Sequence, residues 1–148
     1  MLLWRISAYP GLGGVGGHHQ DGRWHTMKRS VIYAGEHPAL AMVEVMAHMR
    51  LSLTNIPVNL KLIRLMLLDG AIISPPPVLP TGWQANEPAS QTVGNTWLDS
   101  LTGLAMPLPS ALIADSTNYL VNLNHPQSAT HLREDRVDAF WFDKRFLR

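Results

Sequence analysis

Glu44 is the residue in this chain whose surroundings most suggest chemistry. It lies in the mostly apolar segment 39–49, whose good helix formers predict a helix that begins at Pro38. Because residues four apart share a helix face, Leu40, Glu44 and His48 form one column. If that face packs on a sheet, Glu44 is a carboxylate in a largely apolar wall, where a charge is costly unless it is paired. The pattern favours a catalytic carboxylate directed into a cleft, and a column facing water is the alternative.

Two arginines and a serine are further candidates for a site. Arg5 follows Trp4 in an expected strand, and Arg23 precedes Trp24. The planar guanidinium fork binds phosphate or carboxylate groups, and stacking on tryptophan is the structural alternative. Ser110 has no G-x-S-x-G elbow around it, so a hydrolase nucleophile is not predicted at that position.

A glycine-rich segment, residues 10–22, holds six of the eleven glycines. Its residues 11–16 fit the pattern G-x-G-x-x-G, which binds a pyrophosphate where a helix begins at the last glycine. The residues that follow, Gly-His-His-Gln-Asp-Gly, predict no helix start, and the lysine and hydroxyl of a P-loop are absent. We therefore expect a turn or a mobile loop that closes over a site.

Histidines near this segment raise the question of a metal. His18 and His19 are adjacent, and His25 follows six residues later. Zinc sites usually combine set spacings with further imidazole, thiolate or carboxylate ligands, and the chain contains no cysteine. We expect solvated loop histidines and no metal site.

Composition limits the class of protein. The chain has 148 residues, 46% of them hydrophobic and 16% charged, with a formal net charge of +1, which suits one compact domain. This balance gives no electrostatic footprint for nucleic acid. No apolar run is long enough to span a membrane, and the early Arg5 opposes a signal peptide, so we expect a cytoplasmic protein. Residues 51–132 are poor in charge, which fits either a buried sheet or a partner interface.

The expected elements indicate an α+β fold, with more strand than helix. A helix is expected at residues 38–51, and a long irregular segment at 75–95. Strands are expected at residues 2–8, 30–34, 58–68, 104–114, 119–123 and 139–147. Prolines 107 and 109 place the fourth of these strands near an edge of the sheet.

Short motifs that run the length of the chain occur in one characteristic order. They are Trp4-Arg5, the glycine-rich segment, Gly22-Arg23-Trp24, Val31-Ile-Tyr33, Ala41-Met-Val-Glu44-Val, Leu79-Pro-Thr-Gly-Trp83, Gln91-Thr-Val-Gly94-Asn-Thr-Trp97-Leu, Leu108-Pro-Ser110-Ala, Asn122-Leu-Asn-His125-Pro and Phe140-Trp-Phe-Asp143-Lys-Arg145. In this order they resemble the RES domain family, named after an arginine, a glutamate and a serine. The resemblance covers residues 1–148 as a single domain. Two departures are His25, where the family more often has asparagine, and Leu108, where it more often has valine.

The resemblance implies an ADP-ribosyltransferase-like fold, in which a split β-structure with flanking helices encloses an NAD cleft. RES proteins are toxins of bacterial toxin–antitoxin pairs whose antitoxins carry an Xre-like helix-turn-helix. They deplete cellular NAD+ by phosphorolysis or hydrolysis, and some ADP-ribosylate a protein. By resemblance, Glu44, Arg23 and Tyr33 are catalytic, and Arg5, Arg23, Tyr33 and Ser110 bind the substrate. NAD+ is then the substrate, inorganic phosphate a possible co-substrate, and no metal is required.

Elementary chemistry agrees with these roles. Cleavage between nicotinamide and ribose builds positive charge on the sugar, which the Glu44 carboxylate would stabilise. The arginines would pair with pyrophosphate, Tyr33 would stack on nicotinamide, and Ser110 would orient Glu44 or the ligand. A non-catalytic nucleotide- or anion-binding module is the alternative. We expect a hetero-oligomer with the antitoxin, contact with DNA only through that partner, and no membrane partner.

Overall fold

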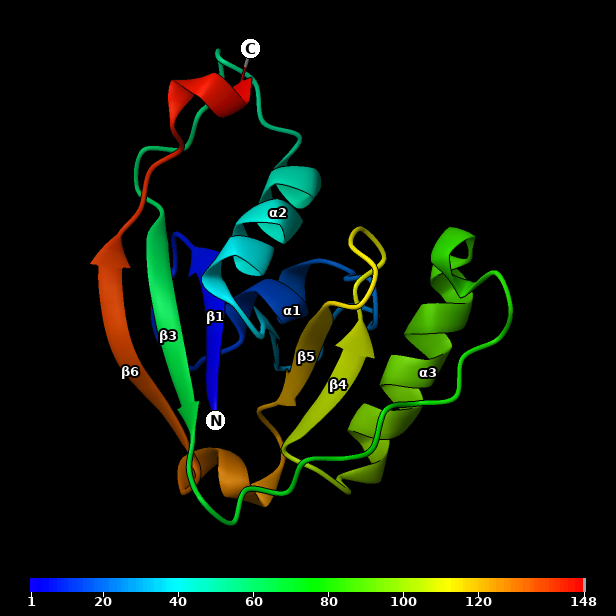
Figure 1. Cartoon of the computed structure of the whole chain (residues 1–148). Coiled ribbons are helices and arrows are strands. Elements are labelled where there is room, and N and C mark those ends of the chain that lie inside the picture. Colours follow the sequence, from blue (N-terminus) through cyan, green and yellow to red (C-terminus); the bar gives the residue numbers. More distant parts are fainter. Residues whose placement is uncertain (148) are drawn as a thin grey trace.

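The computed structural model describes residues 1–147, and within this range the strands form one antiparallel sheet (Figure 1). The spatial order is β4-β5-β2-β1-β3-β6. The strands are β1 (Leu2–Ser7), β2 (Val31–Gly35), β3 (Lys61–Leu67), β4 (Ala105–Pro109), β5 (Thr117–Asn122) and β6 (Leu132–Ala139). The predicted α+β class is confirmed, and β4, which contains the two prolines, lies at an edge of the sheet as expected.

The sheet consists of two halves that meet at a single point. β1 pairs with β3 along its whole length, and β2 pairs with β5 along its whole length. Between β1 and β2, the two central strands, the register contains only Trp4 opposite Gly35. Beyond that pair the strands diverge, so β4-β5-β2 and β1-β3-β6 form separate halves. The split β-structure that the family resemblance implies is confirmed.

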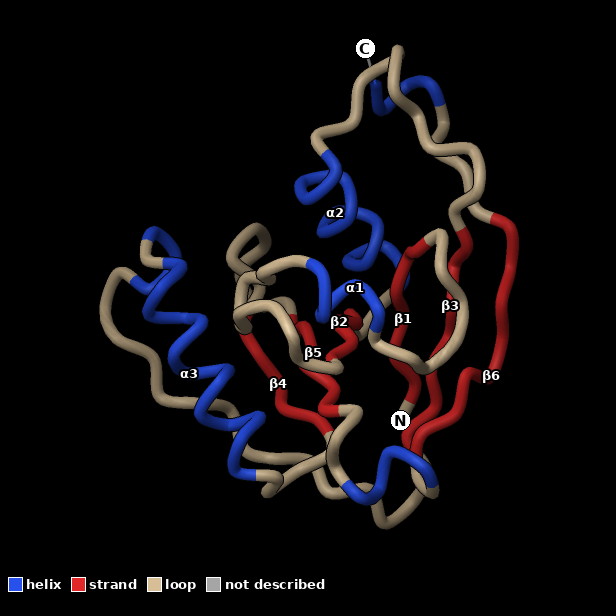
Figure 2. Tube along the Cα trace, turned by 180° about the vertical axis from the view of Figure 1, so that it is seen from behind, coloured by secondary structure: helices blue, strands red, loops and turns tan. Residues whose placement is uncertain are grey.

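Helices cover the junction and one flank of the sheet. Within residues 1–147 they are α1 (Val15–His19), α2 (Pro38–Met49) and α3 (Glu87–Ser100), besides three short 3-10 turns. α2 packs mainly on β1 and β2, and α3 lies beside β4 (Figure 1). Seen from behind, α1 lies close to β1 and β2 (Figure 2). In this described part of the chain no helix is both long and apolar enough to cross a membrane.

The helix that carries Glu44 forms for local reasons and agrees with the prediction to within two residues. The His37 side chain caps its N-terminus by accepting the Ala39 N–H, and Pro38 occupies the first turn. It ends at Met49, and the next residue, Arg50, adopts a left-handed conformation with φ 48°. Its buried residues Leu40, Ala41 and Val45 hold the helix against the sheet. Position 44 therefore lies on the border between the packed face and the open side.

Three apolar clusters form the core. One joins the two halves of the sheet, the second lies under α3, and the third lies between α2 and the C-terminal turn. Burial in the sheet accounts for much of the charge-poor segment 51–132, because its strand residues include Ile63, Leu65, Met106, Leu120 and Val121, all at most 2% exposed. The partner-interface alternative for this segment stays a prediction.

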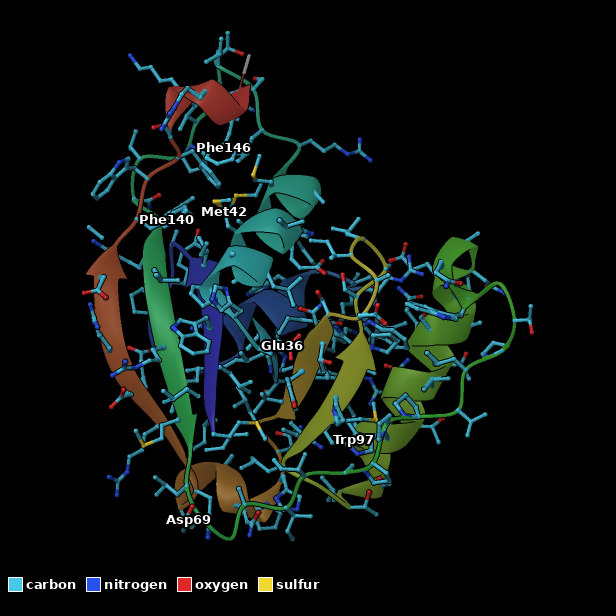
Figure 3. The ribbon with its side chains drawn as sticks, in the orientation of Figure 1. Glu36, Met42, Asp69, Trp97, Phe140 and Phe146 are labelled. Atoms are coloured by element: carbon cyan, nitrogen blue, oxygen red, sulfur yellow. The ribbon has the colours of Figure 1, made fainter. Side chains whose placement is uncertain are left out.

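The irregular segment expected at residues 75–95 is wrong at its C-terminal end, where α3 begins at Glu87. The Asn86 side chain caps the helix by accepting the Ala89 N–H, and proline occupies the first turn. Only a narrow stripe of α3 is buried, so its apolar periodicity is weak. Figure 3 shows Trp97 on the side of α3 toward β4. Its Nε1 donates to Ser74 Oγ at 2.8 Å and ties the helix to the preceding segment.

The strand expected at residues 139–147 is also wrong. β6 ends at Ala139, and the chain continues into a 3-10 turn at Lys144–Leu147. β6 has seven charged or exposed positions along the edge of the sheet. Such a composition protects an edge from aggregation and leaves no apolar alternation that would predict the strand. Phe140 packs edge-on against Phe142 with ring centroids 5.1 Å apart, beside Met42 of α2 (Figure 3).

Two further boundaries differ from expectation. The strand expected at 104–114 stops at Pro109, because a turn follows in which Ser110 N donates to Ser116 O at 2.9 Å. The glycine-rich segment, expected to contain no helix, includes the short α1. Gly14 precedes α1 with φ 64°, a left-handed conformation that glycine adopts at low cost.

Candidate functional site: a cleft between the two halves of the sheet

A cavity of about 250 Å³ lies where β1 and β2 diverge. Four residues singled out from the sequence line it: Arg5 from β1, Arg23 from the loop before β2, Tyr33 from β2 and Glu44 from α2. A second cavity of about 310 Å³ adjoins it under the glycine-rich segment and shares Arg5 and Tyr33. We call the two together the cleft. His48 of α2 lines both cavities, one helical turn from Glu44.

Glu44 is half-buried, and its carboxylate is anchored by residues from the β4-β5-β2 half of the sheet. Ser110 Oγ and Asn118 Nδ2 both donate to Glu44 Oε1 at 2.7 Å. Ser110 Oγ accepts from the backbone N–H groups of Leu112 and Ile113 at 3.1 Å each, so its own proton points to Glu44. The alternative of a water-facing column is wrong, because Glu44 lines the cavity. Ser110, the remaining candidate from the sequence, is thus in direct contact with Glu44.

Arg5 joins the first strand to the glycine-rich segment. Its Nη2 donates to the carbonyl oxygens of Tyr9 at 3.1 Å and Gly11 at 2.8 Å. Gly11 N donates to Glu134 Oε2 at 2.6 Å, so the segment is held from β6 as well. Burial lowers the pKa of Arg5, and the nearby Glu134 carboxylate acts in the opposite direction. Arg5 Nε is buried and has no protein acceptor within residues 1–147.

Arg23 is held against the 3-10 turn at Trp83–Ala85. Its Nη2 donates to the carbonyl oxygens of Trp83 at 2.8 Å and Gln84 at 2.7 Å, and its guanidinium lies 5.5 Å from the Trp83 ring centre. The stacking interpretation is therefore partly correct, with Trp83 in place of Trp24. Arg23 Nε, like that of Arg5, is buried and has no acceptor in the described residues. Both residues line the 250 Å³ cavity, and in the described residues the Nε of each is buried without a protein acceptor.

Tyr33 is positioned by a hydrogen-bonded chain that runs to the glycine-rich segment. Gly17 O lies 3.2 Å from His25 Nε2, which must therefore carry the proton. In the neutral ring Nδ1 then accepts from the Tyr33 hydroxyl at 2.7 Å, and Tyr33 Oη accepts from Trp24 N at 3.0 Å. Burial raises the pKa of Tyr33, so the phenol stays protonated. The hydroxyl is committed to the protein, and Tyr33 lines both cavities of the cleft.

His25 was predicted to be a solvated loop histidine, and this is wrong. Its side chain is 2% exposed. His18 and His19 are exposed, as expected. Within residues 1–147 no three His, Asp or Glu side chains are placed to hold a metal ion.

Acidification is expected to destabilise the protein through His25. Burial lowers the pKa of His25 below its ordinary value of 6.5, with opposing contributions from the Gly17 and Gln20 backbone and Asp21 and a further lowering by Arg29. The unfolded chain therefore takes up a proton first, and the stabilisation present above pH 6.5 is lost as the pH falls through the folded-state pKa.

Urea unfolding between pH 8 and pH 5 measures this loss. His25→Asn keeps an oxygen that accepts the Tyr33 proton and removes the titration, so its free energy of unfolding should fall less over the same range. His19→Asn, on an exposed histidine, is the matched control. Equal pH dependence in His25→Asn and the unsubstituted protein would contradict the assignment.

Sequence reasoning missed two residues of the cleft. No sequence motif singles out Asn118, which pairs with Gly35 two residues beyond Tyr33. His25 stands where the resemblance gives asparagine, and both side chains offer an acceptor at the same reach from the backbone. The exchange of histidine for asparagine at this position therefore indicates that the side chain accepts a buried hydrogen bond and is not exposed to solvent.

The fold places this chain in a class that includes a solved structure. A chain of the crystal structure of the M. tuberculosis MbcT-MbcA toxin-antitoxin complex superposes with a TM-score of 0.70, covering 95% of this chain and 84% of that one. The two sequences are 14% identical, so the likeness shows the fold alone. The class is that of an α+β protein with a split sheet and a cleft between its halves.

Sequence comparison then identifies the family. The chain belongs to the RES domain family, whose model matches residues 2–143, and the resemblance inferred from its motifs is confirmed. A protein named Toxin Res from Pseudomonas putida is 42% identical over 147 residues, which cover 99% of this chain and 100% of that protein. A Prs ADP-ribosylating toxin from Sphingobium sp. is 31% identical over 144 residues, covering 93% of this chain and 87% of its own length.

Proposed function

We propose that this protein is the toxin of a type II toxin–antitoxin pair and that it cleaves NAD+ between nicotinamide and ribose. The observation that carries the proposal is a carboxylate, Glu44, anchored through one oxygen at a cleft whose walls hold two arginines, Arg5 and Arg23. The names of the relatives, Toxin Res and Prs ADP-ribosylating toxin, support the same class of activity.

The reaction is favoured by one negative charge close to the ribose. The bond between the ribose C1 carbon and the nicotinamide nitrogen breaks with both electrons leaving on the nitrogen, so nicotinamide departs neutral and needs no acid. Positive charge grows on the ribose, and the fixed Glu44 carboxylate stabilises it with little reorganisation. An acceptor oxygen then forms the new bond to C1: phosphate gives ADP-ribose 1″-phosphate, and water gives ADP-ribose and releases a proton.

The other candidates bind and orient in this proposal. Arg5 and Arg23 line the cavity and pair with the pyrophosphate, where charge-assisted hydrogen bonds are strong. The Tyr33 ring, with its hydroxyl held by His25, stacks on nicotinamide. Ser110 fixes the carboxylate. His25 acts only through Tyr33 and the loop.

A second acceptor is a protein side chain, which would make the enzyme an ADP-ribosyltransferase. The Prs ADP-ribosylating toxin, at 31% identity, favours this alternative. Cleavage of NAD+ is common to both activities, and they differ only in what attacks C1. A non-catalytic nucleotide-binding module is the remaining alternative and would bind NAD+ without releasing nicotinamide.

The test is nicotinamide release from NAD+ by purified, antitoxin-free protein, with and without phosphate. Release that depends on Glu44 is expected, and its stimulation by phosphate separates phosphorolysis from hydrolysis. Addition of a cell lysate with labelled NAD+ detects transfer to protein. Tight NAD+ binding with no release under any of these conditions would leave the binding module and refute the enzymatic proposal.

We also propose an Xre-like antitoxin partner that covers the cleft, because an always-active NAD+ consumer would harm its host. The solved structure that shares this fold is itself a toxin-antitoxin complex. Depletion of cellular NAD+ requires action in the cytoplasm, which is the location we propose, and any contact with DNA is made by the partner.

Co-expression of this chain with its proposed Xre-like helix-turn-helix antitoxin should yield a stable hetero-oligomer without nicotinamide release. Separation of the partner under mild denaturant should restore the activity. Failure of the two proteins to co-purify, or full activity of the complex, would contradict the proposed partner. The unsubstituted toxin purified alone is the reference for both measurements.

A further inference from the structure

Asn118 stands opposite the junction of the two halves of the sheet. It belongs to β5 and pairs with Gly35 of β2 on one side and Leu108 of β4 on the other. Gly35 is also the residue that pairs with Trp4 across the split. The Asn118 side chain is half-buried and lines the 250 Å³ cavity, where its Nδ2 donates to Glu44 Oε1 at 2.7 Å.

The position of Asn118 is fixed by its neighbours. Glu36, which follows β2, donates its backbone N–H to Thr117 O at 3.1 Å, and Glu36 Oε1 accepts from Thr117 N at 2.8 Å. This pair of hydrogen bonds extends the β2–β5 ladder past Gly35. Figure 3 shows Glu36 near the centre of the molecule, between the two halves of the sheet. The backbone at Asn118 is thus held by pairing with the strands on both sides of β5 and by the hydrogen bonds of the preceding Thr117. The side-chain amide of Asn118 therefore has a defined direction.

The two oxygens of the Glu44 carboxylate have different surroundings. Both protein donors, Ser110 Oγ and Asn118 Nδ2, end on Oε1. Within residues 1–147 no protein donor reaches Oε2. A carboxylate oxygen accepts about two hydrogen bonds, so Oε1 is saturated and Oε2 keeps its capacity for a ligand. A carboxylate held through one oxygen has its second oxygen fixed in direction as well, because the group is planar.

We propose that Asn118 is a positioning residue that, with Ser110, holds Glu44 Oε1 so that Oε2 is presented to the ribose of the substrate. The inference rests on the proposed function and assigns a different role to each oxygen of the Glu44 carboxylate. Oε1 binds the protein donors, and Oε2 contacts the substrate. Asn118 need not touch the substrate, and its effect on the rate passes through Glu44.

Both donors to Glu44 come from the half of the sheet formed by β4, β5 and β2. Glu44 itself comes from α2, a helix that spans the junction between the halves. Ser110 lies after β4 and Asn118 lies in β5. Glu44 is therefore held to the half that carries Tyr33, while Arg5 approaches from the other half. Loss of one donor leaves the carboxylate tethered by the other, and loss of both leaves its direction undetermined. The two donors should consequently act with synergy.

The test compares kcat and KM for nicotinamide release in Asn118→Ala, Ser110→Ala and the double variant. Each single substitution is expected to lower kcat about 10-fold, the effect of one hydrogen bond to a charged group, with KM within about 2-fold. The double variant is expected to lose more than the product of the single effects. A merely structural asparagine would change the melting temperature and KM instead. Asn118→Leu, which keeps a similar shape and removes the donor without adding a charge beside Glu44, replaces Asn118→Ala if the latter does not fold.

Asn95→Ala is the matched control. Asn95 lies on α3, bonds to Thr26 at 3.0 Å, and has no place in the cleft, so its kcat should equal that of the unsubstituted protein. A second readout needs no activity: the Asn118 side-chain amide resonance in a nitrogen–proton spectrum should move in Glu44→Gln more than that of Asn95.

These readouts separate the two hypotheses. No nicotinamide release by the unsubstituted protein, with the amide shift present, overturns the proposed function. Active unsubstituted protein with an unchanged kcat in the folded Asn118 variants overturns the inference. An unmoved amide resonance in Glu44→Gln also overturns it. If the loss of kcat in the double variant equals the product of the two single losses, Ser110 and Asn118 act independently. That result would also contradict the inference.

Discussion

Glu44→Gln is expected to lower the rate of nicotinamide release by at least about 10²–10³-fold, the usual cost of removing one preorganised electrostatic group. The substitution keeps the volume of the side chain and an oxygen that accepts from Ser110 and Asn118. It removes the negative charge that would face the growing positive charge on the ribose. Binding of NAD+ depends on groups elsewhere in the cleft, so the loss should appear in kcat with little change in KM.

Folding of the variant is checked by circular dichroism and a thermal melt, both expected to match the unsubstituted protein. Glu36→Gln is the matched control. Glu36 is exposed, its carboxylate accepts a backbone hydrogen bond that a glutamine oxygen also accepts, and it does not line the cleft. A folded Glu44→Gln variant with normal turnover would refute the mechanism.

Gly94→Ala is expected to cause a large loss of stability, because an added Cβ there would meet a neighbouring atom at a shorter distance than at any other glycine. In an ordinary helix this exchange stabilises by up to about 1 kcal/mol. Here α3 lies against Trp24 so closely that an added Cβ would stand 1.7 Å from the Trp24 carbonyl oxygen. That contact is with backbone, which cannot rotate away, so α3 must shift. Overpacking of this kind costs about 1–3 kcal/mol and occasionally more.

Chemical denaturation measures the change in the free energy of unfolding. Gly16→Ala is the control, because it makes the same exchange in α1 with no atom within 4 Å of the added Cβ. It should leave stability within about 1 kcal/mol. A Gly94→Ala variant as stable as Gly16→Ala would show that α3 is not packed as described. Since Trp24 follows Arg23, displacement of α3 should also reduce the rate of nicotinamide release.

The strands that form the centre of the fold were predictable because their residues alternate or run apolar between clear turns. β1, β2, β3 and β5 all lie within one or two residues of the expected ranges, apart from the start of β3, which comes three residues later. α3 was not predictable from periodicity, since its buried stripe includes Ser90 and Gly94. Asn86 and proline at its start were the readable signals. β6 was hidden by its charges, which suit a solvent-exposed edge.

The site was predictable to the extent that its residues conflict with their local surroundings. Glu44 stands out because a carboxylate among apolar helix residues needs a partner. Its partner Asn118 does not stand out, since an asparagine at the start of a strand is common and its role depends on a distant helix. His25 was misjudged because its burial is created by α1 and Tyr33, which are separated from it along the chain. Contacts between remote segments are what local patterns omit.

The single backbone pairing between Trp4 and Gly35 gives the molecule a mechanical property. A continuous ladder would join the two halves by backbone along their whole length, whereas here one backbone pairing does so, and the other connections are side chains of the apolar core and of α2. Any ligand that bridges Arg5 on one half and Tyr33 on the other adds a further link between the halves. Occupancy of the cleft is therefore expected to restrain movement of the two halves relative to each other.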